Sequence, residues 1–466
     1  MPIELSAIDT SIVVLYFIML VSIGYLVKRK VRGIDDYFLA GRRLTLPIFV
    51  ATLVSTWYGG LLGVGELSYN YGLVNWLTQG FFWYLSYLFF ALFLASKVRK
   101  SNLYTIPDQL ERFYDKKTSF MGAIFNYIMV TPAPYIMSLG IVFSLLLGWP
   151  TWVGIAAGTL VAFFYTMRGG FIGVVYTDII QFLVMFIGVV LVIPFAIVRY
   201  GGFSFLKDNL PATHLAITGE WTTQMILVWG FIAFWTLVDP GFYQRCYAAK
   251  DSKVPRKGIL ISILFWILFD FCTTTIGLYA RAAMPGIDPL TSLPVFASSV
   301  LPMVLKGLFF AGILATIMST IDSFTFLGAM NLSHDIYKRI FNPKAREKHE
   351  MKATKIAVLI TILFALTLAL FFDSIVNMWY TIGTIGISAL LVPMMAGFFY
   401  KGRKSGLAAF LSMIIGAGTS VFWLVNGWIN MYDGWPTYIL GIEPLYPGLL
   451  MSLISFVIAH FLDKKK

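Results

Sequence analysis

The sequence predicts an all-α polytopic membrane protein of about thirteen transmembrane helices, from its composition, the lengths of its apolar runs and the positions of its charges. The chain of 466 residues is 58% hydrophobic and only 12% charged, and its mean hydropathy of +0.79 is too high for a soluble domain. A spanning helix needs about 20 largely apolar residues. The predicted spans are residues 9–27, 46–68, 76–96, 119–147, 151–167, 174–198, 223–244, 258–280, 303–333, 356–372, 375–399, 407–427 and 445–462.

Lysine and arginine gather in alternate loops between these runs. Of the 35 Lys and Arg residues, all but Arg199, Lys207, Arg281 and Lys306 fall on one side of the predicted topology. Because cytoplasmic loops carry the excess of positive charge, we expect the N-terminus outside and the tail at 464–466 in the cytoplasm, in a cell inner (plasma) membrane. The net charge of +12 therefore reflects membrane topology and not a nucleic-acid partner.

The residue patterns of enzymes do not stand out in this sequence. Cys246 and Cys272 have no CxxC spacing, and the four histidines have no metal-ligand spacing. Paired nucleophile and base residues, HExxH and GxSxG are not found either. We therefore expect a protein that is not an enzyme and uses no organic cofactor.

Two predicted spans are interrupted. The span 46–68 contains Gly59-Gly60, and the span 223–244 contains Asp239-Pro240-Gly241. Such breaks persist at membrane depth where they line a protein cavity, because lipid cannot satisfy the freed backbone groups. Since each break opens a run of five spans, the pair predicts a five-plus-five inverted repeat whose halves both begin with a discontinuous helix. Close helix packing by glycine is the alternative interpretation.

The inverted repeat divides the chain into four expected units. These are residues 1–45 (an extra N-terminal helix and a cytoplasmic loop), 46–200 (the first repeat), 201–400 (the second repeat) and 401–466 (two peripheral helices). The charge-rich segment 338–355 is expected to be a solvated cytoplasmic connector.

Five acidic residues fall within or at the edges of the predicted spans. They are Glu66, Asp178, Asp239, Asp270 and Asp322. A charge inside the membrane is costly, and we expect no Lys or Arg to lie deep enough in the spans to pair with these acids. A buried carboxylate without a basic partner is protonated, hydrogen-bonded or bound to a cation. Cation binding is therefore a physical expectation.

The predicted span 303–333 carries the densest group of polar residues. At helical spacing Thr316, Ser319, Thr320 and Ser323 share one face, and Asp322 lies beside Ser319 across a turn. Hydroxyl and freed carbonyl oxygens suit a small cation such as sodium. The alternative is that these hydroxyls donate to carbonyl groups one turn earlier, which is common in membrane helices.

Several short motifs resemble those of the sodium:solute symporter family and occur in that family's order. They are 36–42 (DYFLAGR), 55–60 (STWYGG), 165–166 (YT) with 169–170 (GG), 176–181 (YTDIIQ), 244–245 (QR) with 248–250 (AAK), and Ser319 with Thr320. The likeness extends over roughly residues 5 to 465. It implies a leucine-transporter-like core with one extra N-terminal and two extra C-terminal helices.

The resemblance also implies a principal sodium site. By motif position, its ligands are the carbonyl oxygens of Ser55, Tyr58 and Thr316 and the hydroxyl oxygens of Ser319 and Thr320. Ser55 and Thr316 stand where many members have alanine, and because the main chain ligates the ion, neither change excludes the site.

A second site found in some members corresponds here to Asp178, Ser319, Asp322 and Ser323, with Asp322 in place of a serine. The added carboxylate predicts either two cations per solute or a proton as the second coupling ion. In the alternative interpretation, Asp178 only caps the start of its helix.

Gln79, Trp57, Trp235 and Tyr380 are the residues that we expect to contact the solute. The overall expectation is a sodium-coupled symporter that imports an amino acid such as proline, a monocarboxylate or a pantothenate-like acid, with sugars less favoured. Na⁺ is the expected coupling ion, the solute and the lipid bilayer are the expected partners, and the protein is expected to act as a monomer. A proton-coupled or mixed-cation symporter is the alternative, and an ion channel is an alternative of another class.

Overall fold

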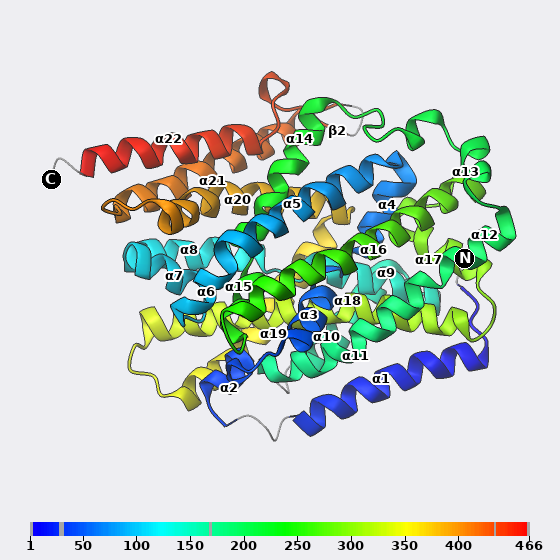
Figure 1. Ribbon diagram of the computed structural model, residues 1–466, viewed down its shortest axis with the longest axis horizontal. Helices are drawn as coiled ribbons and strands as arrows, with labels where there is room; N and C mark the ends of the chain where they lie inside the picture. Colours follow the sequence, from blue (N-terminus) through cyan, green and yellow to red (C-terminus); the bar gives the residue numbers. More distant parts are fainter. Residues whose placement is uncertain (1–2, 28–31, 167–169, 433–434, 464–466) are drawn as a thin grey trace.

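The computed structural model describes residues 3–27, 32–166, 170–432 and 435–463. Most of its helices run along the long axis of the molecule, which is horizontal in Figure 1. The longer helices are α1 (Ala7–Val27), α3 (Leu46–Trp57), α4 (Leu61–Tyr71), α5 (Phe82–Phe89), α6 (Ala95–Ser101), α8 (Lys116–Met129), α9 (Ala133–Leu147), α10 (Thr151–Thr166), α11 (Gly170–Val190), α12 (Val192–Tyr200), α14 (Thr223–Ile232), α15 (Pro240–Ala248), α16 (Lys253–Ala283), α18 (Leu305–Met330), α19 (Glu347–Phe371), α20 (Ile375–Phe399), α21 (Gly406–Ile429) and α22 (Leu445–Asp463). The connecting helices are α2 (Ile34–Leu39), α7 (Ile106–Phe113), α13 (Phe203–Asn209) and α17 (Ser292–Val300).

The number of candidate membrane spans is close to the number that the sequence predicts. Within the described ranges, eleven helical segments are long and apolar enough to cross a membrane, and the bent pair α3 and α4 makes a twelfth. The shorter apolar helix Thr151–Phe164 stands where the remaining span is predicted. The predicted all-α polytopic architecture is therefore confirmed, with thirteen as an approximate number. The tail at 464–466 and Gly169 of the fifth-span motif lie outside the described residues.

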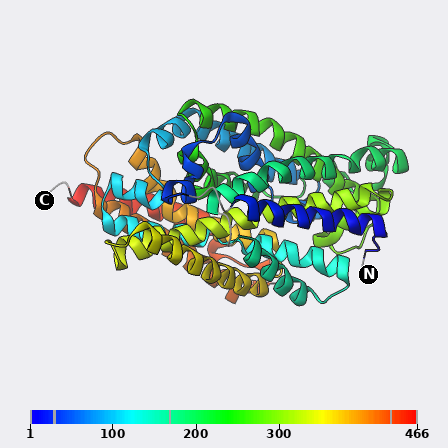
Figure 2. The same ribbon diagram turned by 90° about the horizontal axis from the view of Figure 1, so that it is seen from below.

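The centre of the molecule is formed by α3, α11, α16 and α18. Helix α18 packs against α11, α3, α9 and α1, while α16 packs against α3 and α4. Helix α1 lies along the lower edge of this core, and α21 and α22 lie along the upper edge (Figure 1). Figure 2, seen from below, shows α1 crossing the face of the bundle. Two short antiparallel strands, β1 (Met431–Tyr432) and β2 (Trp435–Pro436), lie between α21 and α22.

Both predicted helix breaks are present. Helix α3 ends at Trp57 and α4 begins at Leu61 after a bend of 55°. In the second break, α14 passes into a 3₁₀ turn at Ala233–Val238 before α15 begins at Pro240. The Asp239 carboxylate caps α15 by accepting a hydrogen bond of 2.9 Å from the amide of Phe242, which satisfies one of the amides that a helix start leaves free.

The sequence predicts that the segment 338–355 is a solvated connector, but part of this segment is buried. Glu350 is completely buried, and its carboxylate pairs with His334 at 2.6 Å and with Lys338 at 2.5 Å. The pairing arises because the first turn of α19 packs against the π-helical stretch Asn331–Phe341 that continues α18. The prediction of solvation is therefore wrong for Glu350.

Candidate cation and solute sites

The break between α3 and α4 depends on two glycines. A Cβ atom on Gly59 would overlap the side chain of Thr320 in α18, and one on Gly60 would overlap the indole of Trp379 in α20. Only glycine therefore lets the broken span approach both helices at this point. The end of α3 also presents carbonyl groups that have no partner within the helix.

A group of oxygen atoms lies where the end of α3 meets the middle of α18. The Ser319 hydroxyl donates to the carbonyl oxygen of Ser55 at 2.8 Å, and the Thr320 hydroxyl donates to that of Thr56 at 2.7 Å. Both hydroxyls also lie within 3.2 Å of the Thr316 carbonyl oxygen. These residues are buried. The cluster thus offers hard oxygen ligands, which a small cation prefers, in a place that excludes bulk water.

The structure brings together four of the five residues predicted for the principal sodium site, namely Ser55, Thr316, Ser319 and Thr320. The fifth, Tyr58, follows at the C-terminal cap of α3, and its hydroxyl donates to the carboxylate of Asp270. The carbonyl oxygen of Thr56 joins the cluster although the motif comparison did not select it. The sequence signal for it was its position three residues before the glycine pair, where a helix end is expected to free carbonyl groups.

Asp178 has a basic partner, which contradicts the sequence-based expectation. Arg245 is fully buried, and its Nη2 lies 3.6 Å from Oδ2 of Asp178. The same nitrogen donates to the hydroxyls of Thr56 at 2.7 Å and Ser323 at 2.6 Å. The expectation failed because the predicted span ended at residue 244, whereas α15 carries Arg245 inward in its last turns.

The residues predicted for a second cation are arranged around this guanidinium group. Asp178 also accepts a hydrogen bond from Thr52, and its Oδ1 has no hydrogen-bond partner among the described residues. Ser323 lies 3.0 Å from the Thr56 hydroxyl. Asp322 is buried, and it lies near enough to Tyr16 in α1 to act on it electrostatically, as Asp178 does.

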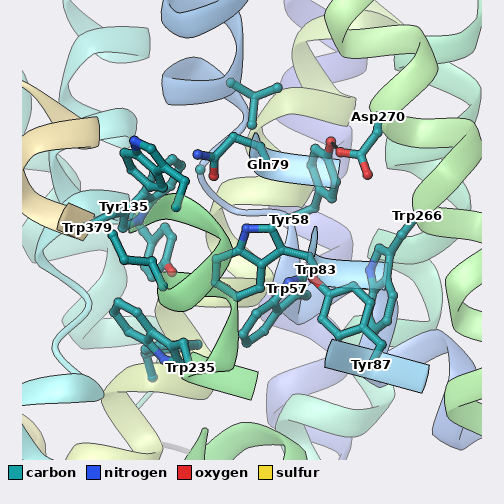
Figure 3. A pocket seen from close by; sticks show the side chains of 15 residues that line it. Trp57, Tyr58, Gln79, Trp83, Tyr87, Tyr135, Trp235, Trp266, Asp270 and Trp379 are labelled. Atoms are coloured by element: carbon teal, nitrogen blue, oxygen red, sulfur yellow. Dashed lines mark hydrogen bonds between the residues drawn. The ribbon is translucent and has the colours of Figure 1, made fainter. Parts of the chain in front are cut away.

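A cavity rich in aromatic side chains lies beside the break. Ten of its fifteen lining residues are aromatic, and Figure 3 shows their rings converging from several helices. The lining residues are Trp57, Tyr58, Gly60, Val64, Gln79, Trp83, Tyr87, Tyr135, Trp229, Ile232, Trp235, Trp266, Asp270, Phe324 and Trp379. Its volume is about 80 Å³, several times the roughly 10–15 Å³ that one water needs on the same measure. The cavity therefore suits a small solute.

One of the described residues that line the cavity is charged, namely Asp270. Both of its carboxylate oxygens accept hydrogen bonds from tyrosine hydroxyls, one from Tyr58 and one from Tyr84. Among the described lining residues, Gln79 Nε2, Trp83 Nε1 and Trp266 Nε1 are buried donors that have no hydrogen-bond partner. Buried donors of this kind are usually paired, so these three lack the partner that a buried donor normally has.

Three of the four residues predicted to contact the solute, Gln79, Trp57 and Trp235, line this cavity. Tyr380 is not among the lining residues; its ring contacts that of Trp229, with ring centres 6.0 Å apart, and its hydroxyl donates to Glu443. The sequence indicated Asp270 only as a buried acid.

Comparison with known proteins places this geometry in context. The model of the family described as the sodium:solute symporter family matches residues 37–416. The osmoregulated proline transporter OpuE of Bacillus subtilis is 27% identical over 97% of this chain and 94% of its own. The high-affinity choline transporter 1 of Drosophila melanogaster is 26% identical over 96% of this chain and 76% of its own. The sodium/pantothenate symporter of Escherichia coli is 24% identical over 96% and 95%.

Two solved structures share the fold. A Na⁺-coupled sialic acid symporter in a substrate-bound outward-open state aligns with a TM-score of 0.81 at 18% identity, over 98% of this chain and 97% of the other. A nucleobase-cation-symport-1 family transporter in a closed conformation aligns with a TM-score of 0.58 at 11% identity, over 93% and 95%. Both chains are cation-coupled transporters by description, and the shared feature shown is the fold.

Proposed function

Because the chain belongs to the sodium:solute symporter family, we propose that the coupling sodium binds between α3 and α18. Its ligands are the carbonyl oxygens of Ser55, Tyr58 and Thr316 and the hydroxyl oxygens of Ser319 and Thr320. The observation that carries this proposal is the contact between the Ser319 and Thr320 hydroxyls and the carbonyl groups at the broken end of α3. When sodium binds, the Ser319 and Thr320 hydroxyls give up their hydrogen bonds to the α3 carbonyl oxygens, and the hydroxyl and carbonyl oxygens coordinate the ion instead.

The same helix end carries both binding sites, which supports coupling. Ser55 and Thr56 face the cation cluster, and Trp57 and Tyr58 face the aromatic cavity. Sodium bound to α3 and α18 holds the Trp57 and Tyr58 walls of the solute site in place. Binding of the solute then permits the two five-helix repeats, 46–200 and 201–400, to rock so that the site opens to the cytoplasm.

The driving force is the sodium gradient and the membrane potential. Moving one charge through 100 mV contributes about 2.3 kcal/mol, roughly a fiftyfold concentration ratio. The cycle runs in a plasma membrane with the N-terminus outside, and a single chain carries it out. The channel alternative is less favoured, because channels build their pores by repetition of a filter loop and no such repeated loop stands out in this sequence.

We propose that the guanidinium group of Arg245 supplies the positive charge at the second site, in place of a second sodium ion. Its guanidinium group contacts Asp178 and Ser323, two of the predicted second-site residues, so a second cation there would meet a like charge at close range. Proton participation through the buried carboxylate of Asp322 stays the alternative. The expected coupling ratio is one sodium per solute.

Uptake into proteoliposomes tests the sodium site. Replacing Ser319→Ala together with Thr320→Ala removes two ligands, and we expect the sodium concentration for half-maximal uptake to rise about tenfold or more, because 1.4 kcal/mol of lost ion binding is tenfold. The matched control is Thr325→Ala, since Thr325 is buried on the same helix and its hydroxyl has no partner among the described residues.

Unchanged sodium dependence in the double variant would show that the ion binds elsewhere. The ratio of initial ²²Na⁺ and solute fluxes in the wild-type vesicles gives the coupling ratio. Two sodium ions per solute would contradict the role assigned to Arg245.

A further inference from the structure

We infer that the solute is a small methylated ammonium compound that carries a hydroxyl or carboxylate oxygen, held in the aromatic cavity beside the break. This inference rests on the proposed function and names the chemical class of its solute. The names of the relatives cover proline, pantothenate and choline, so they do not decide between these classes. The chemistry of the cavity does.

The aromatic lining favours a cation without hydrogen-bond donors. The faces of tryptophan and tyrosine rings attract a cation within about 6 Å of the ring centre, and quaternary ammonium groups are recognised in cages of such rings. Here the rings of Trp57 and Trp83 pack together with centres 5.5 Å apart, and those of Tyr87 and Trp266 with centres 4.3 Å apart. Trp57 also contacts Tyr87, so the four rings form one continuous aromatic wall of the cavity.

Asp270 supplies the complementary charge. Each of its oxygens already accepts one tyrosine hydroxyl proton, which leaves about one acceptor site on each oxygen and a negative charge that acts on the solute. A methylated ammonium group needs only that charge, whereas an ammonium group with N–H donors needs free acceptors. Asp239, which accepts from the indole of Trp235 at 3.2 Å, adds a second negative charge behind the cavity wall.

The polar end of the solute is defined by the unpaired donors. Gln79 Nε2, Trp83 Nε1 and Trp266 Nε1 are buried in the cavity lining without a partner among the described residues. They can donate to a hydroxyl or carboxylate oxygen, which would satisfy polar groups whose burial is otherwise costly. This set suits the hydroxyl of choline or the carboxylate of glycine betaine, which share the trimethylammonium head.

The cavity is poorly suited to the other solutes. No Lys, Arg or His is among its described lining residues, so a monocarboxylate or pantothenate-like acid would place its charge near Asp270 without a basic partner. Arg245 does not compensate, because its guanidinium group is already engaged with Asp178, Thr56 and Ser323. A sugar would need more polar groups than this lining presents.

Ligand binding to the purified full-length protein tests the inference without requiring transport. The intrinsic tryptophan fluorescence is followed while choline, glycine betaine or 3,3-dimethyl-1-butanol is added in NaCl or in KCl. The last compound has the shape of choline but no charge. We expect saturable binding of choline or glycine betaine in NaCl, and binding of the neutral compound that is about tenfold or more weaker. The compound that binds more tightly shows whether the buried donors prefer a hydroxyl oxygen, as in choline, or a carboxylate oxygen, as in glycine betaine.

Two variants separate the charge from the donors. Asp270→Asn should weaken binding of both choline and tetramethylammonium by about tenfold, whereas Gln79→Leu should weaken choline and leave tetramethylammonium, which has no oxygen, unchanged. Glu66→Gln is the matched control for Asp270→Asn, because Glu66 is an acid in a neighbouring span that does not line the cavity. If a variant does not fold, the comparison of the charged and neutral ligands on the wild-type protein still tests the inference.

Two results would overturn the inference. One is binding of the neutral compound as tight as that of choline, and the other is absence of binding by both ammonium compounds. Sodium-driven uptake of proline, pyruvate or pantothenate in the same preparation would then show that the proposed function holds while the solute class is wrong.

Discussion

Arg245 carries a permanent positive charge into the core of the protein. An ion pair at this depth is tolerated because the guanidinium group meets Asp178 at 3.6 Å and donates to the hydroxyls of Thr56 and Ser323. Desolvation of the two charges offsets much of their attraction, so the pair adds little net stability. Removing one partner is different, because the other charge stays buried and uncompensated.

Thermal unfolding in detergent should reveal this pairing. We expect Arg245→Gln alone to lower the free energy of unfolding by about 3–5 kcal/mol. Adding Asp178→Asn should recover a large part of the loss, because neither charge then remains. Strictly additive effects of the two substitutions would mean that the residues do not interact, since coupled partners show non-additive energies.

At the scale of elements, the broken span of α3 and α4 is the part that sequence and packing specify together. Gly59 and Gly60 mark the break in the sequence, and the structure adds the reason that both must be glycine. Gly59 touches Thr320 at the cation cluster, and Gly60 touches Trp379 at the cavity wall. The break thus joins the two sites as well as interrupting the helix.

Substitutions at Gly59 should affect sodium more than stability of the fold as a whole. In Gly59→Ala the new methyl group displaces the Thr320 side chain, so we expect the half-saturating sodium concentration to rise about tenfold. Gly418→Ala is the control, because nothing lies within 4 Å of a Cβ atom at that position in α21. If uptake by the two variants depended equally on sodium, the helix break would not be part of the cation site.

For the whole molecule, we expect the long axis, along which most helices run, to cross the membrane. In Figure 1 the chain begins at the end where α13 lies and finishes at the opposite end. This agrees with an odd number of spans. The distribution of Lys and Arg predicts that the side that holds α13 faces outward.

Cysteine labelling in right-side-out vesicles tests this orientation. Lys207 in α13 and Lys401 after α20 are both exposed, whereas Cys246 and Cys272 are buried, so background labelling should be low. We expect Lys207→Cys to react with a membrane-impermeant maleimide directly, and Lys401→Cys to react only after permeabilisation. The reverse pattern would invert the topology.

The sequence alone determined the spans, their orientation as a prediction, the two breaks and the polar face of α18, because lipid imposes length, hydropathy and charge rules on each segment separately. It also indicated most of the cation cluster, since Ser319 and Thr320 belong to one helical face. Only the tertiary structure decided that Arg245 meets Asp178 and that Asp270 joins Tyr58 beside the aromatic cavity. These partners lie 67 and 212 positions apart, and such contacts depend on how helices pack against one another, which the hydropathy of a single segment does not encode.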